Sequence, residues 1–192
     1  FILQHSDSKV LITDREFSAT ARAALDELAA AGKRLPFVID VDDSEYDGPG
    51  ERIGAIEYEA FIAAGDPDGV CLYPEDEWDA IGLNYTSGTT GNPKGVLYSH
   101  RSSVLHSWAA CAVDGLALGA GETALLVVPM FHVNAWGMPY AGAMSGARLV
   151  MPGPALDGKS VYDLMRDEKV TLALGVPTVW LMLLQHVDAA GL

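Results

Sequence analysis

The apolar and polar positions of the 192-residue chain alternate between two patterns. Short, mostly apolar runs predict buried strands, and apolar residues that recur every three or four positions predict helices between them. This alternation predicts an α/β fold of layered sheets with flanking helices, in which the first β-α-β unit pairs its strands in parallel. The predicted strands are residues 9–13, 35–41, 80–86, 95–98, 123–128, 147–151 and 170–174.

Local signals predict where the helices begin and end. Asp14 and Ser99 are residue types that cap helix N-termini, and Pro177 suits the first position of a last helix. Gly32 and Gly115 are predicted helix stops. Apolar faces are expected at Phe17, Ala21, Ala24, Leu25 and Leu28, then at Val104, Leu105, Trp108 and Ala112, and later at Val161, Leu164 and Met165, with two further helices near 57–64 and 136–144.

The last predicted helix is apolar on every side over residues 179–184. Such a helix is expected to be buried all round, which requires more polypeptide than this chain supplies. The chain also begins at Phe1, with no initiator methionine and no signal peptide. We therefore expect residues 1–192 to be an internal piece of a longer, cytoplasmic protein.

Composition and charge exclude several classes of protein. Apolar residues make up 49% of the chain, enough for a folded core. Lys plus Arg number 12 and Asp plus Glu number 26, a formal charge of −14 that disfavours nucleic-acid and anionic-membrane partners. Fourteen of the acidic residues fall in residues 40–79, which we interpret as a solvated surface connection. Cys71 and Cys111 have no metal-binding or disulfide spacing.

Residues 123–147 lack Asp, Glu, Lys and Arg, but they are not predicted to cross a membrane. Pro129 and Pro139 interrupt the stretch, together with polar residues such as His132 and Asn134. Each interruption would leave backbone groups without hydrogen bonds in lipid. No integral membrane segment is therefore expected, and a strand, a loop and a buried helix suit the stretch better.

The strongest chemical signal is the loop Tyr85–Gly95 between two predicted strands. Its glycines let the backbone approach an anion, successive N–H groups form an anion nest, and its hydroxyls can donate to phosphate oxygens or lie near Mg²⁺. Lys94 adds a positive charge, and between residues 35 and 147 the only other Lys or Arg residues are Arg52 and Arg101. The order Pro93-Lys94-Gly95 disfavours the NTPase P-loop. On composition alone, a hairpin without a ligand is an equal alternative.

Together with its continuation Tyr98-Ser99-His100-Arg101, this loop resembles the signature phosphate loop of the adenylate-forming enzymes. That family includes acyl-CoA synthetases, luciferase-like enzymes and peptide-synthetase adenylation domains. Residues 129–137 resemble the family's Pro-x-Phe-His motif, and the extension Val133-Asn134-Ala135-Trp136 is most similar to medium- and long-chain fatty acyl-CoA synthetases. Residues 175–178 resemble the turn before the next core helix.

The resemblance implies an ATP-dependent reaction that joins a carboxylic acid to AMP, releases pyrophosphate and transfers the acyl group to coenzyme A. It implies that Thr86 lies nearest Mg²⁺, that Lys94 acts electrostatically, and that His132 lies beside the substrate carboxylate and the adenylate. It also places Trp136 at the acyl pocket. The implied phosphate-binding residues are Thr86, Ser87, Gly88, Thr89, Thr90, Gly91 and Lys94, and Val133 and Asn134 line the nucleotide side.

Three apolar residues after the motif, Met138, Tyr140 and Met144, could line an acyl channel, because fatty chains favour flexible apolar walls. Simple core packing is an equal alternative for them. Without its motif, His132 too would be interpreted as a packed histidine. His100 and His106 are six residues apart, on different faces of a helix, and are not expected to bind a metal.

Several elements of the family are missing from residues 1–192. There is no aromatic-Gly-x-Thr-Glu segment to supply a Mg²⁺ ligand, no later ribose-binding Asp, and no C-terminal domain with its catalytic lysine. We expect residues 1–192 to be part of the large N-terminal domain and to be inactive alone. Members of the family are often homodimers, and the complete protein is expected to act on a fatty acid or related carboxylic acid with ATP and CoA. Two alternatives stay open: a ligase with another acid or thiol acceptor, and a non-catalytic nucleotide-binding module.

Overall fold

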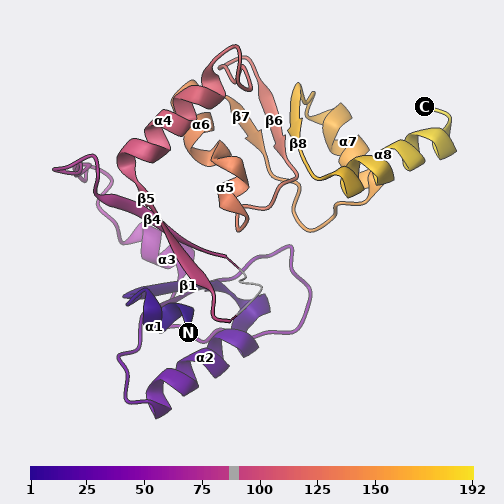
Figure 1. Ribbon diagram of the computed structural model, residues 1–192. Helices are drawn as coiled ribbons and strands as arrows, with labels where there is room; N and C mark the ends of the chain where they lie inside the picture. Colours follow the sequence, from indigo (N-terminus) through magenta and orange to yellow (C-terminus); the bar gives the residue numbers. More distant parts are fainter. Residues whose placement is uncertain (87–90) are drawn as a thin grey trace. The chain divides into compact units, whose positions relative to one another are not determined.

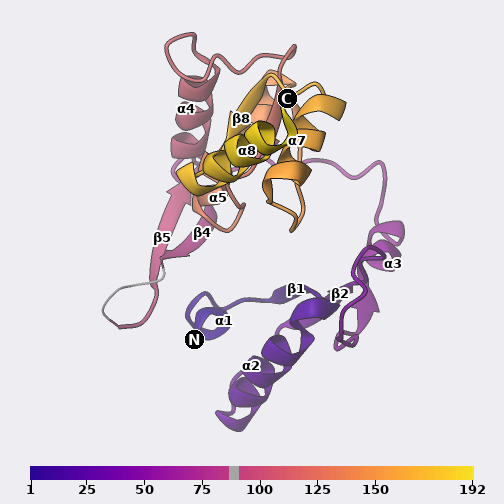
Figure 2. The same cartoon turned by 90° about the vertical axis from the view of Figure 1, so that its right-hand side faces the viewer.

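The computed structural model describes residues 1–86 and 91–192. The chain divides into two compact units, one made of Phe1–Tyr73 with Tyr85–Lys94 and the other of Pro74–Asn84 with Gly95–Leu192. Helices and parallel strands alternate in both (Figure 1 and Figure 2), which confirms the predicted α/β fold. β4 (Ala80–Thr86) and β5 (Lys94–Ser99) pair with each other, and the boundary between the units falls within them.

The first unit begins with the predicted β-α-β arrangement. β1 pairs in parallel with β2, and β2 pairs in parallel with the short β3, which was not predicted. The Asp14 carboxylate accepts from the Glu16 N–H and so caps the segment after β1, as predicted. The elements are α1 (Ile2–His5), β1 (Val10–Asp14), a 3₁₀ helix (Arg15–Phe17), α2 (Ser18–Ala30), β2 (Phe37–Val41), β3 (Ile56–Glu57) and α3 (Tyr58–Ala63).

The acidic segment is partly as expected. Residues 61–80 are all exposed, and in residues 64–79 the chain forms no helix or strand. Asp40 contradicts the prediction, because it is 1% exposed. Its carboxylate accepts hydrogen bonds from the backbone N–H groups of Ile53, at 3.1 Å, and Gly54, at 2.7 Å. These two bonds offset the cost of burying the charge and hold the turn that precedes β3.

The second unit is built on a parallel sheet with the strand order β7-β6-β8. Alternate residues of the central strand and its extension serve two cores, because side chains of a strand point to opposite faces. Ala124, Leu126 and Val128 pack with residues of α4 and α6, whereas Leu125 and Val127 pack with residues of α7 and α8. The elements are α4 (His100–Cys111), β6 (Thr123–Leu126), α5 (Val133–Trp136), α6 (Met138–Ser145), β7 (Arg148–Val150), α7 (Gly158–Asp167), β8 (Leu172–Leu174) and α8 (Pro177–Ala190).

Helix α4 begins as predicted but differs in its end and in its buried face. Ser99 and Ser102 form a capping box, in which each hydroxyl accepts from the other's backbone N–H at 3.1 Å. The helix ends at Cys111 because Ala112 is extended, so the predicted stop at Gly115 is wrong. The small residues Ser107 and Ala110 are buried. The predicted apolar face is exposed instead: Val104 50%, Leu105 50% and Trp108 66%.

Small residues explain the buried face of α4. They let α4 pack directly on α6, and the Ser107 hydroxyl tolerates burial because it donates to the Ser103 carbonyl at 2.8 Å. Helix α8 begins at Pro177 as predicted, yet only Val179 is buried and Leu181 and Leu184 are 57% and 59% exposed. In the described ranges, no helix is both long and apolar enough to span a membrane.

Candidate functional site

Two of the sequence motifs meet at the carboxyl edge of the second unit's sheet. β6 leads into residues 128–137 and β8 leads into Gly175, and the Val128 N–H donates to the Leu174 carbonyl at 3.0 Å. β6 lies between the two strands that follow it in the sequence, so the strand order reverses beside it. Ligands of open parallel sheets bind at the carboxyl ends of strands near such a reversal.

The segment after the Pro-x-Phe-His motif has an unusual backbone. Val133, Asn134, Ala135 and Trp136 have φ values of 49°, 51°, 48° and 57°, so the element labelled α5 is a left-handed turn. The left-handed conformation costs an L-residue roughly 1–2 kcal/mol. Strain of this kind concentrates at functional sites.

The predicted helix over residues 136–144 is confirmed as α6, but this turn moves its start by two residues. Right-handed α6 begins only at Met138, after Gly137, whose φ is 75°. A left-handed turn cannot run directly into a right-handed helix without a change of backbone conformation. Glycine allows that change at little cost.

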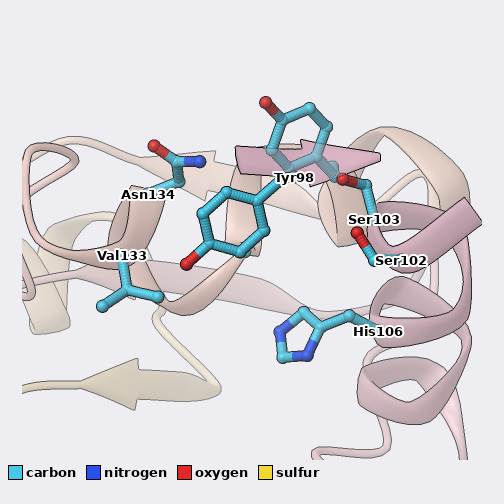
Figure 3. A pocket seen from close by; sticks show the side chains of 8 residues that line it. Tyr98, Ser102, Ser103, His106, Val133 and Asn134 are labelled. Carbon is cyan, nitrogen blue, oxygen red and sulfur yellow. The ribbon is translucent and has the colours of Figure 1, made fainter. Parts of the chain in front are cut away.

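A cavity of about 240 Å³ lies between the left-handed turn and α4. Figure 3 shows Val133 and Asn134 on one side of it and Ser102, Ser103 and His106, which belong to α4, on the other. The hydroxyls of Ser102 and Ser103 donate to the Ser99 carbonyl at 2.9 and 3.1 Å, so their hydrogens are used within α4. The full lining is Tyr98, Ser102, Ser103, His106, Val133, Asn134, Gly137 and Tyr140.

His106 joins α4 to the turn. Its Nε2 lies 2.9 Å from the Trp136 carbonyl oxygen, and because a carbonyl only accepts, Nε2 carries the hydrogen. A Cβ on Gly137 would lie 2.5 Å from His106 Cδ2, so the ring fills the space that a side chain at 137 would need. This contact joins residues 30 positions apart, and no local sequence pattern predicts it. Gly137, directly after the motif, was the one local sequence sign that another side chain comes close to the backbone here.

The other residues predicted around this motif lie in different environments. The side chains of His132 and Trp136 are exposed, and Trp136 contributes its carbonyl group to the contact with His106. Met138 is fully buried in the core. Its position is the one expected if it packs in the core and does not line an acyl channel. Tyr140 lines the cavity, and with Met144 it also lines a second one of about 200 Å³.

The phosphate-loop residues fall at the ends of two paired strands. Thr86 is the last residue of β4 and Lys94 the first of β5, and both are exposed. Within residues 1–86 and 91–192, no carboxylate forms an ion pair with Lys94. Gly91 has a φ of 109° and open space where a side chain would stand. Ser87, Gly88, Thr89 and Thr90 lie outside the described residues.

Tyr85, the first residue of the loop, is anchored within the first unit. Its hydroxyl lies 2.7 Å from His5 Nδ1. The rings of Phe1 and His5 are stacked, with centroids 5.3 Å apart, and both meet the Tyr85 ring edge-on. Nothing in the local sequence pattern predicts this cluster, because His5 and Tyr85 are 80 residues apart.

Comparison with known proteins identifies the family. Residues 1–191 match the AMP-binding enzymes. The chain belongs to this family. It is 46% identical over 181 residues to a medium-chain-fatty-acid–CoA ligase from Ectopseudomonas oleovorans, covering 94% of this chain and 32% of the relative. It is 44% identical over its full length to a 3-methylmercaptopropionyl-CoA ligase from Ruegeria pomeroyi, of which it covers 34%.

The chain thus spans about a third of the length of the curated relatives it matches. Among solved structures, ATP-bound MatB from Rhodopseudomonas palustris superposes with a TM-score of 0.69 at 22% identity. The match covers 96% of this chain and 33% of MatB. At this level of identity, the likeness supports the fold that the sequence pattern predicted.

Proposed function

We propose that this chain is part of an ATP-dependent acyl-CoA synthetase, within its large N-terminal domain. The observation that carries the proposal is the loop Tyr85–Gly95, rich in hydroxyls and glycines and ending in a lone lysine, in a chain that matches the AMP-binding enzymes. The proposed reaction joins a carboxylate to the α-phosphate of ATP and releases pyrophosphate. The thiol of coenzyme A then takes the acyl group, with loss of its proton and release of AMP.

The chemistry assigns distinct roles to the loop. Pyrophosphate gains charge as it leaves, so donors fixed around it lower the barrier of the first step. Exposed Lys94 supplies a positive charge, and the open backbone at Gly91 lets N–H groups approach phosphate oxygens. Thr86 is the proposed hydroxyl beside Mg²⁺. Ser87, Gly88, Thr89 and Thr90 complete the proposed phosphate site.

The proposed acid is a fatty acid. One relative is named for a medium-chain fatty acid, and the run Val133–Trp136 supports the same class. His132 is the proposed residue beside the carboxylate, Val133 and Asn134 are proposed to line the nucleotide side, and Trp136 is proposed to shape the acyl pocket. The second relative is named for a sulfur-containing acid, so another carboxylic acid is the competing candidate.

Pyrophosphate release tests both the reaction and the acid. The complete polypeptide that contains this chain is mixed with ATP, Mg²⁺ and CoA, and straight-chain acids of eight to sixteen carbons are compared with aryl and short-chain acids. We expect release that depends on the acid and is fastest with a fatty acid. Faster release with an aryl or short-chain acid would favour the competing substrate class. ATP binding without acid-dependent release would favour a non-catalytic nucleotide-binding module.

A further inference from the structure

The left-handed turn Val133–Trp136 forms one wall of the cavity, and its conformation is costly for residues with side chains. Val133 is β-branched, which makes a positive φ especially unfavourable. We propose that His106 is a positioning residue that holds this turn in place and thereby sets which acids the site accepts. The part concerning acids rests on the proposed ligase function, whereas the part concerning the turn does not.

The turn has some hydrogen bonds of its own. The Ala135 N–H donates to the His132 carbonyl at 3.1 Å, and the Gly137 N–H donates to the carbonyl of Asn134 at 2.9 Å. These bonds close the turn but do not attach it to another element. The bond from His106 Nε2 to the Trp136 carbonyl attaches it to α4.

His106 is suited to this role because its helix is itself well fixed. α4 begins at the Ser99–Ser102 capping box, and its buried residues Ser107 and Ala110 follow His106 directly in the helix that packs on α6. The His106 ring also occupies the space left open by Gly137. The turn is therefore attached to α4 by a hydrogen bond at Trp136 and by close packing at the next residue, in addition to Ala135, which is 0% exposed and packs in the core.

The same arrangement explains why His106 would act on substrate choice rather than on the reaction itself. Its Nε2 hydrogen is committed to a backbone carbonyl, so that nitrogen is not available to move a proton. Releasing the turn would displace Val133 and Asn134, which line the cavity from the side opposite His106 (Figure 3). Because Val133 and Asn134 are also proposed to line the nucleotide side, the KM for ATP should rise together with that for the acid, whereas hydrogen exchange in helices away from the turn should stay the same.

Two substitutions of His106 separate the hydrogen bond from the ring. His106→Phe keeps a ring beside Gly137 but removes the donor, and His106→Gln restores an N–H donor. His186→Phe is the control, because His186 lies against Tyr162 with ring centroids 5.7 Å apart and is absent from the cavity lining. Each variant is made in the complete polypeptide. The KM values for acid and for ATP are measured together with amide hydrogen exchange of residues 131–140 and, as a reference, of α7 in the other core.

We expect His106→Phe to raise the KM for the acid about 3- to 10-fold, the range for one lost hydrogen bond, and to raise the KM for ATP as well, with exchange in α7 unchanged. The difference in KM between acids of different chain length should become smaller. Amide hydrogen exchange at residues 133–137 should become faster. His106→Gln should reverse these changes in part, because it restores the donor but not the ring, and His186→Phe should change none. If His106→Phe does not fold, Gly137→Ala, which pushes the ring away, should give the same changes.

Three results would overturn the proposal. In the first, exchange at residues 133–137 and the acid KM stay at wild-type values in His106→Phe. In the second, exchange accelerates in α7 as well as at residues 133–137, which indicates general loss of structure. In the third, His106→Gln behaves like His106→Phe. A wild-type protein that shows no acid-dependent turnover would instead refute the proposed function, and the exchange rates would still decide whether His106 holds the turn.

Discussion

Gly137 and Gly146 adopt nearly the same backbone conformation, with φ values of 75° and 74°, but they face different surroundings. A Cβ at Gly137 would meet the His106 ring at 2.5 Å, whereas a Cβ at Gly146 would meet Ala120 at an ordinary 3.7 Å. The pair therefore separates the cost of a positive φ from the cost of a steric clash.

We expect Gly146→Ala to lower the free energy of unfolding by about 1 kcal/mol, because alanine disfavours a positive φ. Gly137→Ala should cost about 2–3 kcal/mol, since the clash with His106 adds to the same backbone penalty. Urea denaturation of both variants measures the difference. Equal losses of unfolding free energy in the two variants would show that the clash with His106 adds nothing to the cost of Gly137→Ala.

The N-terminus of α7 gives a second prediction at the level of single residues. Hydrogen bonds from the Ser160 hydroxyl and backbone N–H hold the pKa of Asp157 below its ordinary value of 3.8. A carboxylate whose pKa is lower in the folded state contributes stability above its ordinary pKa, and that contribution is lost as the pH falls through the folded value.

Asp157→Asn should therefore destabilise the protein at neutral pH, and its difference from wild type should shrink as the pH falls below 3.8 and disappear below the lowered pKa of Asp157 in the folded protein. Thermal unfolding across the pH range is the measurement. Asp26→Asn is the control, since it removes a carboxylate that caps no helix. A difference between wild type and Asp157→Asn that does not depend on pH would contradict this account.

At the scale of elements, helix ends could be predicted from the sequence because their signals are local. Asp14 and Ser99 each accept from an N–H two or three residues away, and Pro177 acts through its own fixed backbone angle. Asp14 caps the 3₁₀ helix that leads into α2, Ser99 caps α4, and Pro177 begins α8. The phosphate loop was likewise predicted to connect two strands, and β4 and β5 pair on either side of it. Its individual binding roles stay predictions.

Contacts between distant residues could not be predicted in the same way. The buried face of α4 is set by α6 rather than by its own most apolar residues, and Asp40 is buried because a later turn supplies two N–H donors. The hydrogen bond from His106 reaches a left-handed turn 30 positions later in the sequence. Each of these depends on partners that sequence spacing does not reveal.

Ser99 provides the test at this scale. Ser99→Ala removes the acceptor for the Ser102 N–H at the start of α4, so the free energy of unfolding should fall by about 1 kcal/mol. Ser99→Asp should retain most of the stability, because aspartate also caps helices. Chemical denaturation compares the three proteins. Equal stability of the alanine variant and wild type would mean that the cap does not stabilise the fold.

At the scale of the whole molecule, two observations bear on whether the 192-residue chain can act alone. The chain spans about a third of the relatives it matches, and α8 leaves Leu181 and Leu184 exposed although it is apolar on every side. Further polypeptide that covers this face would bury both residues. We expect the 192-residue chain alone to form no acyl-adenylate, and the complete polypeptide to form it. Adenylate formation by the purified chain alone would contradict this expectation.

The most direct test of the central claim is acid-dependent exchange between ATP and labelled pyrophosphate, which detects adenylate formation without CoA. The complete polypeptide should exchange only when a carboxylic acid is present. Lys94→Ala should slow the exchange about 100-fold or more, the effect of losing one charge-stabilising group. Lys33→Ala, which removes another exposed lysine, should leave it unchanged. Exchange that does not require an acid, or that survives the loss of Lys94, would contradict the assignment of this loop as the pyrophosphate site of an acyl-CoA synthetase.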